Sequence, residues 1–179
     1  PEAIKGAQAV AASIFIALHW TGEIDELKVH IRDFVTNQFE YNMNRTLNEI
    51  RPRYEFDVSC QGSVPEAIIA FLEADSYEDA IRNAVSLGGD ADTQGAIAGA
   101  IAACVYPISE YIIKECQRRL SDDLLKVVIR FEDYLDNEWQ NKISLPCSCL
   151  QPKRETVEPE KYVDIIRDNI DLIHKSIKI

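Results

Sequence analysis

The residues best suited to chemistry in this chain are two aspartates one residue apart, Asp90 and Asp92, followed by the hydroxyl of Thr93. Two carboxylates this close repel each other, and a hard divalent cation such as Mg²⁺ or Mn²⁺ relieves that repulsion by binding both through oxygen. Gly88 and Gly89 come just before them and allow a sharp exit from the preceding segment. An alanine-rich segment follows, and the N-terminal end of a helix there would favour negative charge.

Three interpretations of the paired aspartates can be compared from the sequence. A solvated helix cap fits the pattern of residue types as well as a metal site does. A calcium loop of the EF-hand type is excluded, because its last position requires a bidentate glutamate and falls on Ile101. Apolar runs at 80–87 and 96–105 flank the pair, and no basic residue lies between Arg82 and Lys114. Partly buried carboxylates without a partner are costly, which favours the metal site.

Further segments surround the aspartates in a definite order. They are residues 60–73 (CQGSVPEAIIAFLE), residues 77–86 (YEDAIRNAVS) and the opening residues 1–7 (PEAIKGA). With the glycine–aspartate loop at 87–97, they resemble the C-terminal signature of the ADP-ribosylglycohydrolase family. The resemblance covers residues 1 to 120 or so, and residues 143–179 resemble no family that we can place.

This resemblance implies a function and a set of site residues. Members of the family hydrolyse the glycosidic bond between ADP-ribose and an acceptor, often a protein side chain, with two Mg²⁺ or Mn²⁺ ions and no covalent intermediate. By resemblance, Asp90 and Asp92 are the catalytic carboxylates, and with Thr93 they are metal ligands. The segment before the Ser-Val-Pro helix lines the ADP-ribose pocket in the family, which implies substrate-binding roles for Val58, Ser59, Gln61 and Ser63. Ser63 is also interpreted more simply as a helix cap.

The family pattern has further parts that are absent from this sequence. They are an N-terminal Gly-Asp segment, a Thr-Asp-Asp metal motif and a loop histidine that precedes the segment matching Pro1. We therefore expect this chain to carry the C-terminal half of the site and to have little activity alone. An upstream segment or a complementary chain is the expected partner, together with an ADP-ribosylated substrate. Two alternatives stay open: a non-catalytic structural or ADP-ribose-binding member of the family, and a hydrolase of another glycoside.

Composition limits the class of protein. The 179 residues include 46% hydrophobic residues, which is enough for a globular domain with its own core. The net charge of −11 argues against a large nucleic-acid interface. No apolar run reaches the roughly 18 residues that cross a bilayer, so no membrane contact is expected. The first residue is proline, and the natural N-terminus is therefore expected upstream.

Other reactive residue types are interpreted as structural. We expect reduced core thiols at Cys60, Cys104 and Cys116, and a reducing cytoplasmic location. A zinc site at Cys147 and Cys149 is disfavoured, because only His174 could add a ligand. We expect exposed or hydrogen-bonded histidines, not catalytic bases, at His19, His30 and His174. Solvated or capping carboxylates are expected at Glu2, Glu66 and Glu73.

Hydrophobic periodicity predicts an all-α fold, a compact multi-helix bundle. Helices are expected over 3–18, around 27–34, from a Ser63/Glu66 capping box to Glu73, from Ser76 to Gly88, over 93–105 and over 124–139, with a short turn at 46–50 and caps at Ser109 and Ser121. Residues 1–142 are predicted to form the C-terminal part of a helical glycohydrolase domain. Residues 143–159 are predicted to form a loop. Residues 160–179 are predicted to form an amphipathic helix docked on the same domain, with a stripe of Val163, Ile166, Ile170, Ile173 and Ile177.

The segment 93–105 is rich in small residues, with Gly95 and Gly99 four positions apart. A glycine inside a helix costs about 1 kcal/mol relative to alanine, so two of them require an offsetting gain. Close approach of neighbouring helices is the simplest gain. We therefore expect this helix to be the most buried of the chain, with neighbours crossing over both glycines.

Overall fold

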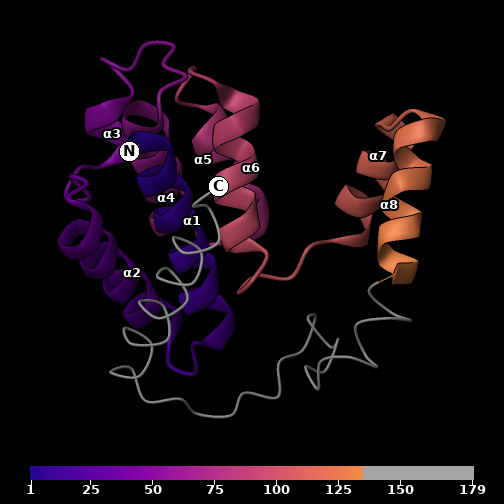
Figure 1. Cartoon of the computed structure of the whole chain (residues 1–179), viewed down its shortest axis with the longest axis horizontal. Coiled ribbons are helices and arrows are strands. Elements are labelled where there is room, and N and C mark those ends of the chain that lie inside the picture. The colour runs from indigo at the N-terminus through magenta and orange to yellow at the C-terminus, as the bar shows by residue number, and fades with distance from the viewer. Residues whose placement is uncertain (135–179) are drawn as a thin grey trace, which may run out of the picture. The chain divides into compact units, whose positions relative to one another are not determined.

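The computed structural model describes residues 1–134, and within this range all of the regular secondary structure is helical (Figure 1). The all-α prediction is therefore confirmed. The described residues divide into two compact units, 1–106 and 107–134. The first holds α1 (Glu2–His19), α2 (Ile24–Phe39), α3 (Leu47–Ile50), α4 (Cys60–Leu72), α5 (Tyr77–Val85) and α6 (Ala91–Ala102), and the second holds α7 (Glu110–Arg119) and α8 (Asp122–Tyr134).

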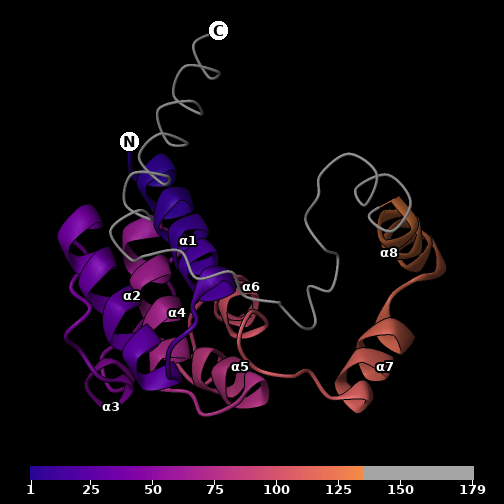
Figure 2. The same cartoon turned by 90° about the horizontal axis from the view of Figure 1, so that it is seen from below.

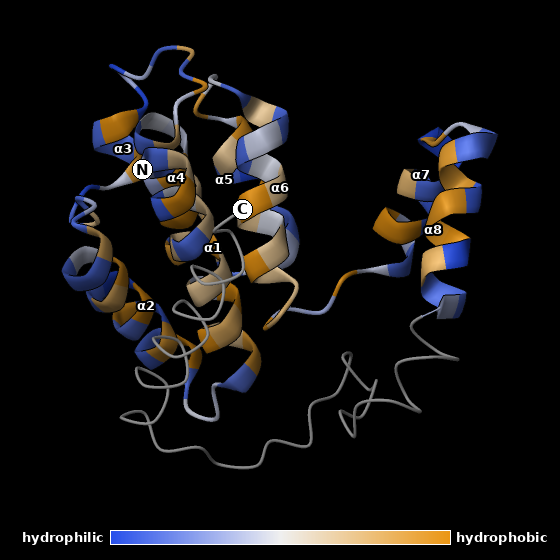
Figure 3. Ribbon diagram, in the orientation of Figure 1, coloured by the Kyte–Doolittle hydropathy of each residue, from blue (hydrophilic) through white to orange (hydrophobic). Residues whose placement is uncertain are grey.

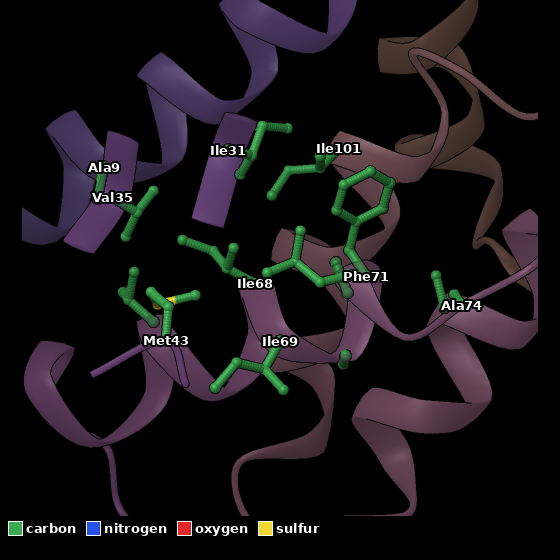
Figure 4. Close-up of a cluster of buried hydrophobic side chains, with 14 of the residues drawn as sticks. Ala9, Ile31, Val35, Met43, Ile68, Ile69, Phe71, Ala74 and Ile101 are labelled. Atoms are coloured by element: carbon green, nitrogen blue, oxygen red, sulfur yellow. The ribbon is translucent and has the colours of Figure 1, made fainter. Parts of the chain in front are cut away.

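Helix α4 is the centre of the first unit. It packs against α1, α3, α5 and α6, while α2 packs against α1 (Figure 2). Every residue from Ser63 to Leu72 is buried, which no other helix of the described residues matches. Its side chains Ile68 and Phe71 lie toward those of Ile31 and Ile101, whereas Ile69 enters the core on another side of the helix (Figure 4). The expectation that 93–105 would be the most buried helix is therefore wrong. The continuous apolar run of α4 takes that place, because a helix surrounded on all sides needs apolar residues on all sides.

The start of α4 differs from the prediction. The helix begins at Cys60, and the Ser59 hydroxyl accepts a hydrogen bond from the Gly62 amide at 3.2 Å. The predicted capping box at Ser63 and Glu66 does not form. Ser63 lies inside the first turn, where its hydroxyl donates to the Ser59 carbonyl at 2.7 Å. Ser59 is therefore the N-cap, four residues upstream of the predicted one.

Removing the true cap should cost more stability than removing the predicted one. Ser59→Ala is expected to lower the free energy of unfolding by about 1 kcal/mol, because the Gly62 amide loses the hydroxyl and keeps only the Ser59 carbonyl at 3.2 Å as acceptor. Ser63→Ala should have a smaller effect, because its own backbone amide keeps the Ser59 carbonyl bonded at 3.0 Å. Chemical denaturation of both variants measures the difference. A larger loss for Ser63→Ala would mean that the helix starts at the later serine.

Two other predicted helix starts agree with the structure, whereas α5 ends three residues before the predicted Gly88. Ser76 caps α5 by accepting from the Asp79 amide at 3.1 Å, as predicted. The expected turn at 46–50 is α3, closed by a capping box between Thr46 and Glu49. Helix α5 ends at Val85, three residues before Gly88, whose φ of 78° lets the chain leave in a left-handed conformation.

The two glycines of α6 have different surroundings. A Cβ atom on Gly99 would lie 2.7 Å from the Cδ1 atom of Ile81 on α5. A Cβ atom on Gly95 would meet no atom within 4 Å. The close helix crossing predicted over both glycines is therefore confirmed at Gly99 and wrong at Gly95.

The second unit consists of α7 and α8, both amphipathic (Figure 3). The Ser109 hydroxyl caps α7 by accepting from the Ile112 amide at 3.4 Å, as predicted. The predicted helix over 124–139 is present as far as Tyr134. Its last part lies outside the described residues, as do the loop at 143–159, the helix at 160–179, the Cys147–Cys149 pair and His174.

The described cysteines Cys60, Cys104 and Cys116 are free thiols, as expected, although Cys116 is exposed and the other two are only partly buried. Within residues 1–134, no helix combines the length and the apolar character that crossing a bilayer requires.

Candidate functional site

The paired aspartates lie where the chain turns from α5 into α6. Asp90 is the residue before the first turn of α6, and its side chain makes no capping hydrogen bond. Asp90 is half-buried, whereas Asp92 and Thr93 are exposed. The sequence predicted partial burial for both aspartates, and this is correct only for Asp90. Asp92 faces solvent because the apolar runs on either side turn inward with α5 and α6.

The two carboxyl groups nevertheless lie together. A hydrogen bond shared with the Asp90 carboxyl lowers the pKa of Asp92, and the Thr93 amide, which donates to Asp92 Oδ1 at 2.9 Å, acts in the same direction. The positive end of the α6 dipole also favours the ionised form. The pair therefore offers carboxyl oxygens that lie close together.

This donor set fits a hard cation chemically but does not by itself complete a site. Asp90, Asp92 and Thr93 offer only oxygen atoms, which suits Mg²⁺ or Mn²⁺. Within the described residues, no three His, Cys, Asp or Glu side chains form a cluster able to hold a metal ion. Mg²⁺ takes about six ligands, so waters or other groups must add to these three.

Tyr54 joins the aspartate loop to the first turn of α4. Its hydroxyl donates to the Gly62 carbonyl at 2.6 Å and accepts from the Gln94 side-chain amide at 2.7 Å. Burial, together with the charges of Glu66 and Asp57, raises the pKa of Tyr54 to about 12. The phenol therefore stays protonated at physiological pH and keeps its donor role.

The predicted substrate-binding residues follow one another around the start of α4. Val58 is 69% exposed and Gln61 is also exposed. Ser59 is the helix cap, and Ser63 is buried with its hydroxyl turned to the Ser59 carbonyl. Val58 and Gln61 present side chains to solvent, so they are the better placed of the four to contact a ligand. Their roles remain predictions.

Asp57 adds a carboxylate to this segment. Its Oδ1 accepts from the Ser59 amide at 2.7 Å, and hydrogen bonding to Ser59 lowers the pKa of Asp57. The Asp57 carboxylate also lies over Gly62, at a place that a Cβ atom there would occupy. This packing holds the 57–62 turn in one conformation.

Glu66 differs most from its expected role. The sequence indicated a solvated or capping carboxylate, but its side chain is 5% exposed and its Oε1 accepts from Arg45 at 2.6 Å. Burial raises the pKa of Glu66, and the bond to Arg45 partly opposes that rise. Glu66 Oε2 is buried without a partner among the described residues. Local sequence did not reveal this ion pair, because Arg45 lies 21 positions from Glu66 in the chain.

The remaining expected structural residues agree better. His19 Nδ1 is 2.8 Å from the Phe15 carbonyl, and His30 is half-buried against Trp20, with rings 5.2 Å apart. Burial lowers the pKa of His30. The Glu73 carboxylate accepts from the Leu47 amide at 2.9 Å, at the start of α3. It therefore has a capping role, as one of the two expected alternatives.

A groove of about 630 Å³ lies beside this region. It is lined by residues 48–50 and 52–54 and by Arg45. Tyr54 belongs both to this lining and to the link with the aspartate loop. Gln94 completes that link and was not predicted from sequence. In the sequence, Gln94 is a polar helix residue with no distinguishing pattern, because its partner Tyr54 lies 40 positions away.

Comparison with known proteins identifies one family. The family described as ADP-ribosylglycohydrolase matches residues 1–142, which is more than half of the chain. No curated protein and no solved structure matches the chain.

Proposed function

The chain belongs to the ADP-ribosylglycohydrolase family of hydrolases, whose members are generally metal-dependent, and we propose that it contributes to hydrolysis of an ADP-ribose conjugate. The observation that carries the proposal is the juxtaposition of the Asp90 and Asp92 carboxyls at the start of α6. The bond that breaks is the glycosidic bond between ADP-ribose and its acceptor, and water supplies the incoming oxygen.

In this proposal, Asp90, Asp92 and Thr93 hold a divalent cation, Mg²⁺ or Mn²⁺, in a centre of two ions. When bound, the ions orient the ribose hydroxyls and a water next to the anomeric carbon and offset the charge that develops there. The low pKa of Asp92 and the positive end of the α6 dipole keep the Asp92 carboxylate ionised. Val58, Ser59, Gln61 and Ser63 are proposed to contact the ADP-ribose, with Val58 and Gln61 exposed to it.

Three donor side chains do not satisfy an octahedral cation, so the proposal includes additional ligands. The family pattern implies that they come from a Thr-Asp-Asp motif on an upstream segment or a complementary chain. Cys60, Cys104 and Cys116 form no disulfide among the described residues, and we propose that the protein works in a reducing cytoplasm.

Asp90→Asn and Asp92→Asn test the proposal in the chain combined with the proposed upstream segment or complementary chain. Each should weaken Mn²⁺ binding and slow ADP-ribose release by more than about 100-fold, because removing even an indirect metal contact costs 10- to 100-fold. Isothermal titration with Mn²⁺ and release of ADP-ribose from a modified protein are the measurements. Thermal midpoints should hardly change, because the Asp90 side chain makes no capping bond and an asparagine at position 92 keeps an oxygen that can accept from the Thr93 amide.

Asp25→Asn is the matched control. Asp25 is also an exposed acidic residue in the first turn of a helix, α2, and should leave both measurements unchanged. Full turnover by either site variant would refute the assignment. ADP-ribose binding without turnover in the unaltered protein would favour the non-catalytic alternative.

A further inference from the structure

Tyr54 contacts the aspartate loop on both sides of Asp90. Before it, the Tyr54 ring occupies the space that a Cβ atom on Gly89 would require, with Cε1 nearest. After it, Gln94 donates its side-chain amide to the Tyr54 hydroxyl at 2.7 Å. Gln94 is also the residue whose backbone amide bonds the Asp90 carbonyl at 2.9 Å, closing the first turn of α6.

The same hydroxyl fixes the loop to a second element. It donates to the Gly62 carbonyl at 2.6 Å, inside the first turns of α4. One phenol therefore connects residues 89–94 with the turn that carries Ser59 and Gln61. The sequence separates these two segments by about thirty positions, and the hydroxyl holds them by two short hydrogen bonds.

The Asp90 side chain does not fix its own position by a capping hydrogen bond, so contacts from other residues must do so. A typical N-cap aspartate anchors itself by accepting from an amide two or three residues on, but Asp90 makes no such bond. Gly88 and Gly89 next to it add backbone freedom. Without Tyr54, Gln94 would lose its side-chain anchor, because Gln94 is fully buried and, among the described residues, its side chain hydrogen-bonds only to that phenol.

We propose that Tyr54 is a positioning residue that clamps the Gly89–Gln94 corner to the start of α4 and so holds Asp90 and Asp92 in place for their cation. What the aspartates do rests on the proposed function, whereas the clamp itself does not. Tyr54 acts through the loop and need not touch the metal or substrate.

Tyr54→Phe removes the hydroxyl and leaves the ring against Gly89. Amide hydrogen exchange is measured on the 179-residue chain, segment by segment. Loss of two hydrogen bonds of ordinary strength should speed exchange in residues 89–94 by roughly tenfold or more. Exchange in α1 and α2 should be unchanged. Tyr111→Phe is the matched control, because Tyr111 is 74% exposed on α7 and lies in the other unit.

Gln94→Met removes the hydrogen bond between Gln94 and the Tyr54 hydroxyl by changing its donor. It provides an independent test if Tyr54→Phe fails to fold. Gln94 Oε1 is buried and unpartnered among the described residues. A methionine of similar volume should therefore keep the thermal midpoint close to that of the unaltered chain while loosening residues 89–94. Unchanged exchange at 89–94 in both variants, or an equal rise in every helix, would overturn the clamp.

A second measurement connects the clamp to the site. In the chain combined with the proposed upstream segment or complementary chain, Tyr54→Phe should weaken Mn²⁺ binding about tenfold. This is the lower end of the effect of indirect metal contacts. Raising Mn²⁺ should restore turnover, which a general loss of structure would not allow. If the unaltered protein bound no Mn²⁺, the proposed function would fail, and the exchange experiment would still decide the clamp.

Discussion

Arg45→Met is expected to lower the free energy of unfolding by roughly 3 kcal/mol at neutral pH, near the lower limit for breaking a buried ion pair. Glu66 is 5% exposed and would remain as a buried carboxylate without a counter-charge. The lower limit applies because the Arg45 side chain is 34% exposed, so part of its charge already interacts with water. Chemical denaturation at pH 7 measures the loss.

This loss should depend on pH in a defined direction. Burial raises the folded-state pKa of Glu66 above its ordinary value of 4.5, and Arg45 restrains that rise. In Arg45→Met the restraint is gone, so the folded protein binds its proton more tightly than the unfolded chain does. Stability is then greatest below the unfolded pKa and falls as pH rises through the folded pKa. At pH 4 the destabilisation should shrink to about 1 kcal/mol, the value of one hydrogen bond.

Two further variants isolate the charge effect. Arg53→Met makes the same chemical change on an exposed arginine of the neighbouring turn and should have little effect at either pH. Adding Glu66→Leu to Arg45→Met removes the buried charge and should recover most of the lost stability. A destabilisation that stayed the same from pH 4 to pH 7 would show that Arg45 acts by packing and not by charge.

The structure shows which elements local sequence could predict. Ser76 and Asp79 predicted the start of α5 correctly because their capping bond spans three residues and depends on nothing else. The same reasoning, applied to Ser63 and Glu66, predicted the wrong N-cap for α4. There, Glu66 is engaged by an arginine from a distant loop, and Ser59 had already taken the cap.

In the candidate site, too, sequence predicted the residues that are neighbours in the chain and missed those that are far apart. Asp90, Asp92 and Thr93 are adjacent in sequence, so their spacing alone indicated shared chemistry. Tyr54 and Gln94 are 40 positions apart, and neither residue type predicts its partner. The support for a site is therefore harder to predict than its ligands, because it arises from contacts that exist only after α4 and α6 have packed.

Burial of α6 was overestimated for a related reason. Small residues in a helix predict that a neighbouring helix packs closely against it, but they do not show which face or which residue makes the contact. Gly99 faces Ile81 on α5, whereas Gly95, one turn earlier, has free space where its Cβ would be. The apolar residues of α4, which continue from Val64 to Leu72 except at Glu66, were the better indicator of a central helix.

Gly95→Ala and Gly99→Leu are therefore expected to act in opposite directions. Gly95→Ala should stabilise the protein by about 0.5–1 kcal/mol, because alanine restricts the unfolded chain and meets no atom within 4 Å. Gly99→Leu should destabilise it by about 2–3 kcal/mol, because the new side chain must displace Ile81 and separate α5 from α6. Thermal and chemical denaturation measure both.

Gly99→Ala combined with Ile81→Val tests the cause at single-atom level. A Cβ atom at position 99 would lie 2.7 Å from Ile81 Cδ1, and valine lacks that atom. The two substitutions should therefore be less destabilising together than the sum of their separate effects, as expected for residues that share a contact. Because α6 begins at the Asp90 corner, Gly99→Leu should also weaken Mn²⁺ binding, whereas Gly95→Ala should not. Additive effects, or an unchanged midpoint for Gly99→Leu, would mean that α5 and α6 are not held together at this point, and the position of the aspartates would then need another support.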